Sequence, residues 1–242
     1  MKKVAILQSD YIPWKGYFDI INSVDEFILY DDMQYTRRDW RNRNQIKTPS
    51  GMLWLTIPVE SKGKFYQRIR DTKVTGHKWA QEHWRSISLN YARAPYFKDY
   101  GPFFEKLYGE AEKLDYLSEI NHLFLTGICS LLGIRTAISW SSDYPLAEGK
   151  TERLAALVRS AGGSYYLSGP AAKDYIEDQV FKDAGIQLAY MSYEGYPEYP
   201  QRGDSFTHNV SILDLLFMTG PSAPEYMLSF RGGKDGSADS AL

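Results

Sequence analysis

The first thirty residues contain the stretch that decides the fold, KVAILQSDYIPWKGYFDIINSVDEFILY at residues 3–30. Residues 3–7 form a short apolar run that stops at Gln8, and residues 26–30 form a second one. Between them, residues 16–23 carry apolar side chains at helical spacing. Short apolar runs bounded by turns are typical of buried strands in a parallel sheet. The order of strand, helix and strand therefore predicts a βαβ unit.

The same alternation returns in the last third of the chain. Patterns there predict strands at residues 135–140, 164–167 and 187–193, and helices at residues 151–160 and 211–218. Between the two regions we expect a hairpin from residues 43–47 and 52–59, and helices at residues 79–93, 97–107 and 116–132. The prediction is an α/β fold with a mostly parallel sheet flanked by helices, Rossmann-like, with a helical insertion in the middle third.

One domain is expected to account for most of the chain. We predict a single α/β domain at residues 1–230, with the helical insertion at about residues 76–133. Residues 231–242, RGGKDGSADSAL, are polar and rich in glycine, so we predict a disordered tail there.

Charge is unevenly distributed along the chain. The formal net charge is only -2, but residues 34–93 contain 13 Lys and Arg against 4 Asp and Glu. The rest of the chain contains 15 against 26. A basic block in an otherwise acidic protein forms a surface that attracts anions. The composition of the whole chain is not that of a nucleic-acid-binding protein, so no nucleic-acid partner is expected.

Aromatic residues make up 15% of the chain, with 19 tyrosines and 6 tryptophans. One interpretation is a Tyr-rich core and rim. The other is a set of surfaces that stack on a sugar or a nucleotide, because Tyr and Trp combine an apolar face with a polar group. The single cysteine, Cys129, lies in an apolar helical pattern and is expected to pack in the core.

Neither a signal peptide nor a membrane span is predicted. The apolar run that follows the two N-terminal lysines is four residues long and ends at Gln8. No apolar stretch approaches the roughly 20 residues that cross a bilayer. The sequence therefore predicts a soluble, cytoplasmic protein, and it does not indicate an oligomeric state.

The loop after the first strand is unusually aromatic for a connection between a strand and a helix. Ligands of parallel α/β sheets bind beyond the carboxyl ends of the strands, which is where this loop lies. Gln8 needs polar partners there, and Gly16 allows a ligand to approach the start of the next helix. The expected substrate-binding residues are Gln8, Tyr11, Trp14, Gly16 and Tyr17. The alternative is a hydrophobic plug that caps the end of the sheet.

Two adjacent acids, Asp31 and Asp32, follow the second predicted strand. Alternate side chains of an extended segment point to opposite sides, so one acid should face a pocket and the other should face away. We choose Asp32, which is nearer to the basic block, as the general base or as the group that orients an amine. Asp31 is the alternative acid. His83 is the other candidate base, because histidine titrates near neutral pH, and a structural role is its alternative.

The segment QYTRRDWRNRNQIK at residues 34–47 combines five cations with one acid and a tryptophan. Arginine binds phosphate through two parallel hydrogen bonds, and an indole can stack on a base or a sugar. A plain solvated basic loop would more often use lysine. The expected substrate-binding residues of this segment are Arg37, Arg38, Trp40, Arg41, Asn42, Arg43 and Lys47.

A second ligand-facing turn is expected at Ser168-Gly169-Pro170, where a predicted strand leads into a helix. Free amides and a proline at the first helical position suit a phosphate or a carboxylate. Further expected substrate contacts are Ser168, Gly169, Lys173 and His208. We predict that this turn comes from a strand next to the first one, and that it lines one pocket together with Gln8 and Asp31-Asp32. Zinc, metalloprotease and α/β-hydrolase motifs are absent, and no metal is expected.

Three quoted segments together resemble the WbqC-like family. They are QSDYIPWKGYFDIINSVDEFILYDDMQYTRRDWRNRNQIKTPSG with the WLTIPV strand that follows, KTERLAALVRSAGGSYYLSGPAAKDYI, and FTHNVSILDLLFMTG. The similarity runs from Val4 to about Gly220, nearly the whole chain. Ser9 departs from the family pattern, which usually has proline there, but the aromatic and glycine positions of the loop are kept.

The resemblance implies a role in bacterial O-antigen (lipopolysaccharide) or other surface-polysaccharide biosynthesis. The implied activity is transfer of glycine or a related acyl group to the amino group of a sugar, and the family brings no catalytic residues. The expected partners are a nucleotide-linked amino sugar and glycine or an activated acyl donor, with ATP or a carrier-bound donor for activation. The alternative is a non-catalytic module that binds a sugar nucleotide or a carrier in a polysaccharide assembly complex.

Overall fold

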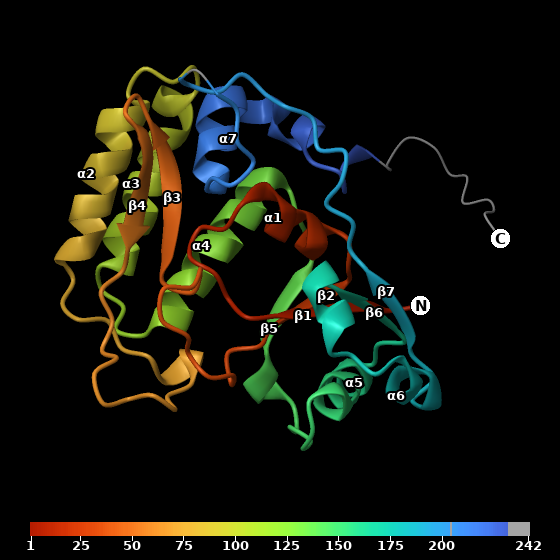
Figure 1. Ribbon diagram of the computed structural model, residues 1–242. Helices are drawn as coiled ribbons and strands as arrows, with labels where there is room; N and C mark the ends of the chain where they lie inside the picture. Colours follow the sequence, from red (N-terminus) through yellow and green to blue (C-terminus); the bar gives the residue numbers. More distant parts are fainter. Residues whose placement is uncertain (204, 232–242) are drawn as a thin grey trace.

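The computed structural model describes residues 1–203 and 205–231, and its centre is a five-stranded parallel sheet (Figure 1). The strands stand in the order β5 (Ala137–Trp140), β2 (Glu26–Leu29), β1 (Lys3–Leu7), β6 (Tyr165–Ser168) and β7 (Gln187–Tyr190). In the middle strand, Val4 pairs with Glu26 on one side and with Tyr166 on the other. The predicted α/β, Rossmann-like fold is confirmed, and so is the expectation that the first strand and the strand before Ser168-Gly169 are neighbours.

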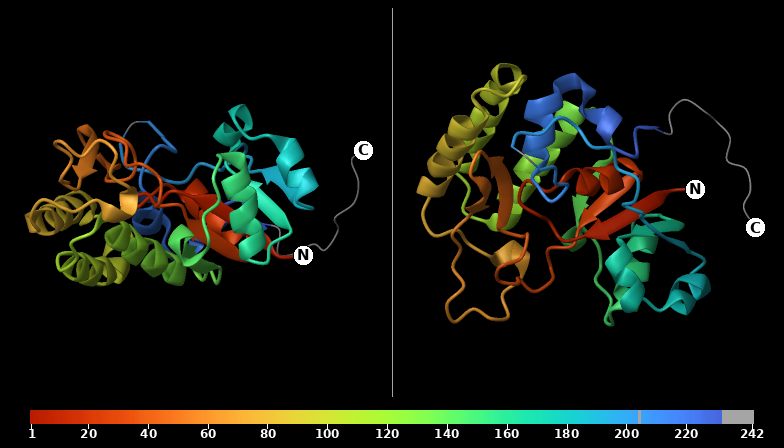
Figure 2. Two further views of the ribbon diagram at one scale, coloured as in Figure 1. Left: turned by 90° about the horizontal axis from the view of Figure 1, so that it is seen from below. Right: turned by 45° about the horizontal axis from the view of Figure 1, so that its top comes forward.

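Helices cover both faces of the sheet, which explains why its strands are apolar on both sides. Val4 and Ile6 of β1 face one core cluster, whereas Ala5 and Leu7 face the other. The first cluster is closed by α5 (Thr151–Ser160) and α6 (Asp178–Asp183), and the second by α1 (Lys15–Asn22), α4 (Leu117–Leu132) and α7 (Ile212–Thr219). The sheet therefore lies between two helical layers (Figure 2).

The chain between β2 and β5 forms a large excursion to one side of the sheet (Figures 1 and 2). It contains the antiparallel hairpin of β3 (Arg43–Thr48) and β4 (Gly51–Thr56), then α2 (Lys78–Tyr91), α3 (Phe97–Ala111) and α4. The predicted hairpin and the three predicted helices are confirmed. That the whole is one domain stays a prediction.

Short helices complete the described chain, and the sequence patterns missed most of them. They are η1 (Ile69–Asp71), η2 (Ser141–Asp143), η3 (Pro170–Asp174) and η4 (Gly220–Tyr226). The helix expected after Ser168-Gly169 is η3, a single 3₁₀ segment with Pro170 as its first residue, and α6 follows it. The predicted tail lies outside the described residues, apart from Arg231. Among residues 1–203 and 205–231, no helix is long and apolar enough to cross a membrane.

The aromatic loop after β1 is mostly packed into the core. Tyr11 is fully buried, with its ring edge-on to Phe124 at 5.5 Å between centroids. The ring of Tyr17 packs on Phe27 at 5.4 Å, and its hydroxyl donates to the backbone oxygen of Gln8 at 2.8 Å. Tyr11 and Tyr17 therefore plug the end of the sheet, as in the alternative interpretation.

The packing of this loop explains why residue 16 is a glycine. A Cβ atom at this position would overlap the indole of Trp14, which lies across the start of α1. The glycine therefore makes room for a side chain of its own loop, whereas the sequence pattern suggested room for a ligand. The indole also packs edge-to-face with the ring of Tyr193, with ring centroids 5.0 Å apart.

Replacing Gly16 by alanine should destabilise the protein by about 1–3 kcal/mol, because the added methyl group forces the Trp14 indole out of its position. Urea denaturation followed by circular dichroism measures the loss. Gly109→Ala is the matched control: it lies in α3, and a Cβ there would meet nothing within 4 Å. That change should stabilise by about 0.5–1 kcal/mol. Equal effects of the two substitutions would contradict the packing role of Gly16.

Candidate functional site

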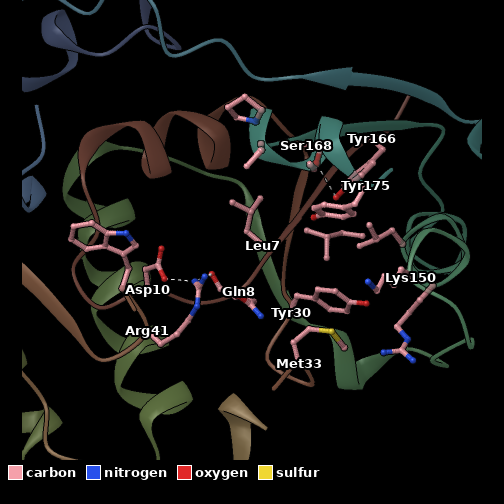
Figure 3. A pocket seen from close by; sticks show the side chains of 18 of the residues that line it. Leu7, Gln8, Asp10, Tyr30, Met33, Arg41, Lys150, Tyr166, Ser168 and Tyr175 are labelled. Carbon is pink, nitrogen blue, oxygen red and sulfur yellow. Dashed lines mark hydrogen bonds and ion pairs between the residues drawn. The ribbon is translucent and has the colours of Figure 1, made fainter. Parts of the chain in front are cut away.

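A cavity of about 1060 Å³ opens at the carboxyl ends of β1 and β6. The chain leaves β1 to form β2 on one side, whereas β6 is added on the opposite side of β1. Doubly wound α/β proteins bind ligands at such a reversal of strand order, because the connections diverge and leave a crevice. Gln8, Ser168 and Gly169 all line this cavity, so the structure brings these three predicted residues together (Figure 3).

One wall of the cavity is basic and aromatic. Lys150 is the N-cap residue of α5, and Arg153 lies in its first turn, where its Nε donates to the backbone oxygen of Ala147 at 2.7 Å. Tyr30 and Tyr175 line the same wall. Cations in the first turn of a helix oppose the helix dipole, so their presence there is not explained by helix stability. Together with the free amides of that turn they form a place suited to a phosphate group.

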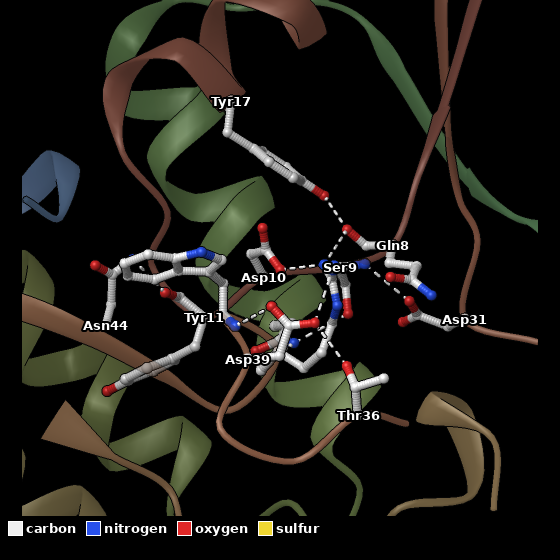
Figure 4. A network of polar contacts seen from close by, with 12 residues as sticks. Gln8, Ser9, Asp10, Tyr11, Tyr17, Asp31, Thr36, Asp39 and Asn44 are labelled. Carbon is white, nitrogen blue, oxygen red and sulfur yellow. Dashed lines mark hydrogen bonds and ion pairs between the residues drawn. The ribbon is translucent and has the colours of Figure 1, made fainter. Parts of the chain in front are cut away.

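The opposite wall carries a charged pair, Asp10 and Arg41, beside the half-exposed indole of Trp40 (Figures 3 and 4). The Arg41 guanidinium contacts Oδ1 of Asp10 and also donates to the backbone oxygen of Gln8 at 3.3 Å. Both charged side chains are 15% exposed. A backbone hydrogen bond of 3.1 Å from the Tyr11 amide to Trp40 joins the two loops that carry this pair.

The pKa of the Asp10 carboxyl group is raised toward neutral pH. Burial raises its pKa to about 6, and the nearby charges of Asp39 and Asp31 act in the same direction, whereas Arg41 opposes them. A carboxylate with such a pKa, at the rim of a ligand cavity, can accept a proton from a substrate and release it again. The cavity thus offers cations on one wall and a proton acceptor on the other.

Neither of the two adjacent acids lines the cavity. Asp31 is 1% exposed, and its carboxylate accepts hydrogen bonds from the Ser9 amide at 2.8 Å and from the Ser118 hydroxyl. Asp32 pairs with Arg70 at 3.2 Å and accepts from Ser141 at 2.7 Å. The expectation that one of them faces a shared pocket with Gln8 was wrong, because both carboxylates are held by hydrogen bonds and ion pairs to other residues.

His83 also lies away from the cavity, in the interior of α2. Its Nδ1 is 2.9 Å from the Tyr11 hydroxyl, which in turn is 2.7 Å from the hydroxyl of Tyr108. Burial lowers the pKa of His83 to about 4, so the ring is neutral at pH 7. These contacts fit the structural role that was the alternative for this histidine.

The predicted basic segment is divided between the cavity and the surface. Trp40 and Arg41 line the cavity, but Arg37 donates to the backbone of Ser61 at 2.5 Å, and Arg43 lies over the Trp54 ring at 4.1 Å. Arg38 is exposed. The placement of these three arginines does not support a phosphate site formed by the whole segment.

Two other predicted residues of this region, Asn42 and Lys47, hold neighbouring segments in place, and so does Asn44, which was not predicted. The Asn42 amide donates to Ile57 at 2.7 Å, and the Asn44 amide donates to Tyr11 and Ile12 at 3.1 and 3.0 Å. Lys47 is 6% exposed and donates to Gln201 at 2.9 Å. These hydrogen bonds account for the donor groups of the three side chains without a ligand, whereas the buried side-chain oxygen of Asn42 has no hydrogen-bond partner among the described residues.

The remaining predicted contacts lie outside the large cavity. Lys173 is exposed and sits over the Tyr190 ring at 5.3 Å, and His208 lies between Phe206 and Tyr196. Trp14 faces a separate, smaller cavity. Cys129 is buried in α4, where burial raises its pKa to about 12, so its thiol stays protonated at neutral pH.

Several residues of the cavity were missed by the sequence patterns: Asp10, Tyr30, Lys150, Arg153, Tyr175 and Tyr193. Two features of the sequence could have identified some of these residues. Asp10 lies two residues beyond Gln8 in the loop already singled out, and Lys150 and Arg153 place cations at a helix start, where acids are preferred. The tyrosines gave no signal, because aromatic residues are common throughout the chain.

The fold is that of an α/β protein with a cavity at the switch point of a Rossmann-like parallel sheet. The sequence profile of the WbqC-like protein family matches residues 8–226, and the chain belongs to this family. It is 51% identical over 227 residues to "Uncharacterized protein Rv1507c" of Mycobacterium tuberculosis (strain ATCC 25618 / H37Rv), which covers 94% of this chain and 98% of that protein. No solved structure matches the chain.

Asp10 should titrate with an apparent pKa of about 6. Difference titration of the protein against Asp10→Asn should show about one extra proton released by the unmodified chain around that pH. Asp39→Asn serves as the control. It should keep the transition but shift it to lower pH, because the Asp39 charge raises the pKa of Asp10. Identical titration curves for the protein and Asp10→Asn would disprove the assignment.

Proposed function

We propose that this protein is a transferase of bacterial surface-polysaccharide biosynthesis, which forms an amide between a nucleotide-linked amino sugar and glycine or a related amino acid. The observation that carries the proposal is a single cavity with cations on one wall and a carboxylate of raised pKa on the other. A substrate that bears both phosphates and an amine needs both walls. Membership of the WbqC-like family supports the same role.

The phosphates of the nucleotide are assigned to the α5 wall. Lys150 and Arg153 supply charge, and the first-turn amides of α5 supply hydrogen bonds. Tyr30 and Tyr175 offer faces and hydroxyls for the base or ribose. The Ser168-Gly169 turn closes this side of the cavity and adds a hydroxyl at the end of β6.

The amine of the sugar is assigned to Asp10. Amide formation requires that the sugar nitrogen attack an acyl carbon, that the nitrogen lose a proton, and that the leaving group depart from the acyl carbon. Asp10 accepts the proton, for which a pKa of about 6 is suitable near neutral pH. Arg41 stabilises the negative charge that develops on the acyl oxygen, because its guanidinium lies at the same rim.

Glycine must be activated before it reacts, since a free carboxylate is a poor acyl donor. Either ATP, through a phosphate or adenylate leaving group, or a carrier thioester meets this need. The acid that the sequence pattern favoured, Asp32, is less suited to act at the acyl carbon because its carboxylate faces Arg70 and Ser141.

A non-catalytic module that binds a sugar nucleotide is the second candidate. The Asp10–Arg41 ion pair favours it, because a paired carboxylate is also a good fixed contact for a bound amine. Turnover separates the two candidates. An enzyme forms a product that is heavier than the amino-sugar nucleotide by one glycyl residue. A binding module binds the nucleotide but forms no product with any acyl donor.

Asp10→Asn should lower the rate of glycyl transfer by about a hundredfold or more, the usual size of a lost proton-transfer group. The assay is mass spectrometry of an amino-sugar nucleotide incubated with glycine and ATP, or with a thioester donor. Asp32→Asn is measured in parallel with thermal stability. Lost turnover in Asp32→Asn beside normal turnover in Asp10→Asn would move the base to Asp32, and normal turnover in both would end the assignment of a carboxylate base.

Lys150→Ala and Arg153→Ala should each weaken binding of UDP-glucosamine or another amino-sugar nucleotide by about tenfold, the effect of losing a charge-assisted hydrogen bond. Calorimetric titration measures the change. Lys182→Ala is the control, since this lysine is exposed on α6 and does not line the cavity. The melting temperatures of all three variants should stay near that of the unmodified protein. A fall in melting temperature without a change in affinity would show that these cations are structural.

A further inference from the structure

A second cavity of about 260 Å³ adjoins the first. Asp10 and Trp40 line both cavities, so these two side chains form the partition between them. The remaining walls of the small cavity come from the opening loop, with Pro13 and Trp14, and from Asn44 and Asn209. Three segments that lie far apart in the sequence therefore meet at this point.

Backbone hydrogen bonds hold the three segments together. The Ile212 amide donates to Pro13 at 2.9 Å, and the Ser211 amide donates to Gln45 at 2.9 Å, which ties the chain before α7 to the opening loop and to the hairpin. Asn44 braces the opening loop at Ile12, whose φ of 37° is unusual for a β-branched residue. These hydrogen bonds hold in place the backbone segments that carry the walls of the small cavity.

The chemistry of the walls selects one kind of ligand. Trp14 and Trp40 provide two indoles, which attract a cation electrostatically and also pack on the apolar face of a sugar ring. Arg41 engages Oδ1 of Asp10, so Oδ2 is the oxygen that can accept from a ligand. Two indoles and a carboxylate are the components of a site for an ammonium group.

We propose that the small cavity is the subsite for the amino-bearing ring of the acceptor, with its ammonium group on Asp10 and its ring against Trp14 and Trp40. This inference rests on the proposed function and adds that the site has two parts. The phosphates bind at the α5 wall of the large cavity, and the amino sugar binds in the small cavity, on the other side of Asp10 and Trp40. Glycine has the same ammonium group but no ring to cover the indoles, so the ring-bearing amine is the better match.

Saturation-transfer NMR with free monosaccharides tests the subsite without any nucleotide. Glucosamine at millimolar concentration should show saturation from the protein, whereas glucose, which lacks the amine, and glycine, which lacks the ring, should show much less. Asp10→Asn should weaken the glucosamine signal by about tenfold, because a charge-assisted contact is lost. Asp183→Asn is the matched control, since this acid is exposed on α6 and lines neither cavity, and it should keep the signal.

A pair of tryptophan variants tests the ring contact. Trp40→Ala should abolish the glucosamine signal, and Trp40→Phe, which restores an aromatic face, should return part of it. Circular dichroism checks that each variant is folded. Equal signals for glucosamine and glucose, a stronger signal for glycine, or a glucosamine signal unchanged in Asp10→Asn would each overturn the proposal.

The outcomes also separate this inference from the proposed function. Specific glucosamine binding without glycyl transfer would leave the amine subsite in place and remove the transferase. Glycyl transfer without specific glucosamine binding would keep the transferase and remove the small cavity from its site.

Discussion

The buried carboxylate of Asp31 is the interaction on which the arrangement of this protein depends. It stands at the end of β2 and accepts hydrogen bonds from the Ser9 amide, just beyond β1, and from the Ser118 hydroxyl at the start of α4. The Ser118 hydroxyl also accepts from the Trp140 indole at 3.2 Å, at the end of β5. A buried carboxylate is costly unless it is fully hydrogen-bonded, so these partners fix three strand ends and one helix start relative to each other. Because Ser9 directly precedes Asp10, the same contact positions the carboxylate that we propose as the proton acceptor.

The fold could be predicted from the sequence because its main signals are local. The runs at residues 3–7 and 26–30 and the helix at residues 151–160 have the right period and are bounded by turns, and the structure has β1, β2 and α5 there. Strand order was only partly predictable, because it depends on contacts between segments far apart. The short helices η3 and α6 were harder, since one or two turns give too little periodicity to detect.

The cavity lies at the strand ends where the sequence predicted a site, but many of the residues that line it were not predicted. Parallel strands carry their ligands at their carboxyl ends, so Gln8 and Ser168 could be found from strand positions alone. Whether an acid faces a cavity depends on its tertiary partners, and no local pattern reveals these. Asp31-Asp32 looked catalytic because two acids stood beside a basic block, yet both act as braces, whereas Asp10 gains its raised pKa from burial that only the folded chain creates.

The excursion between β2 and β5 has a consequence for how the chain folds. These two strands are neighbours in the sheet, but residues 30–136 separate them along the chain, and the hairpin and helices α2 to α4 lie in between. Closing so long a connection costs chain entropy before the strand contacts can repay it. For the same reason we expect the local unit of β1, α1 and β2 to form early and β5 to join the sheet late. Until then the outer edge of β2 is unpaired, and the nascent chain is most exposed to association with other chains during this interval.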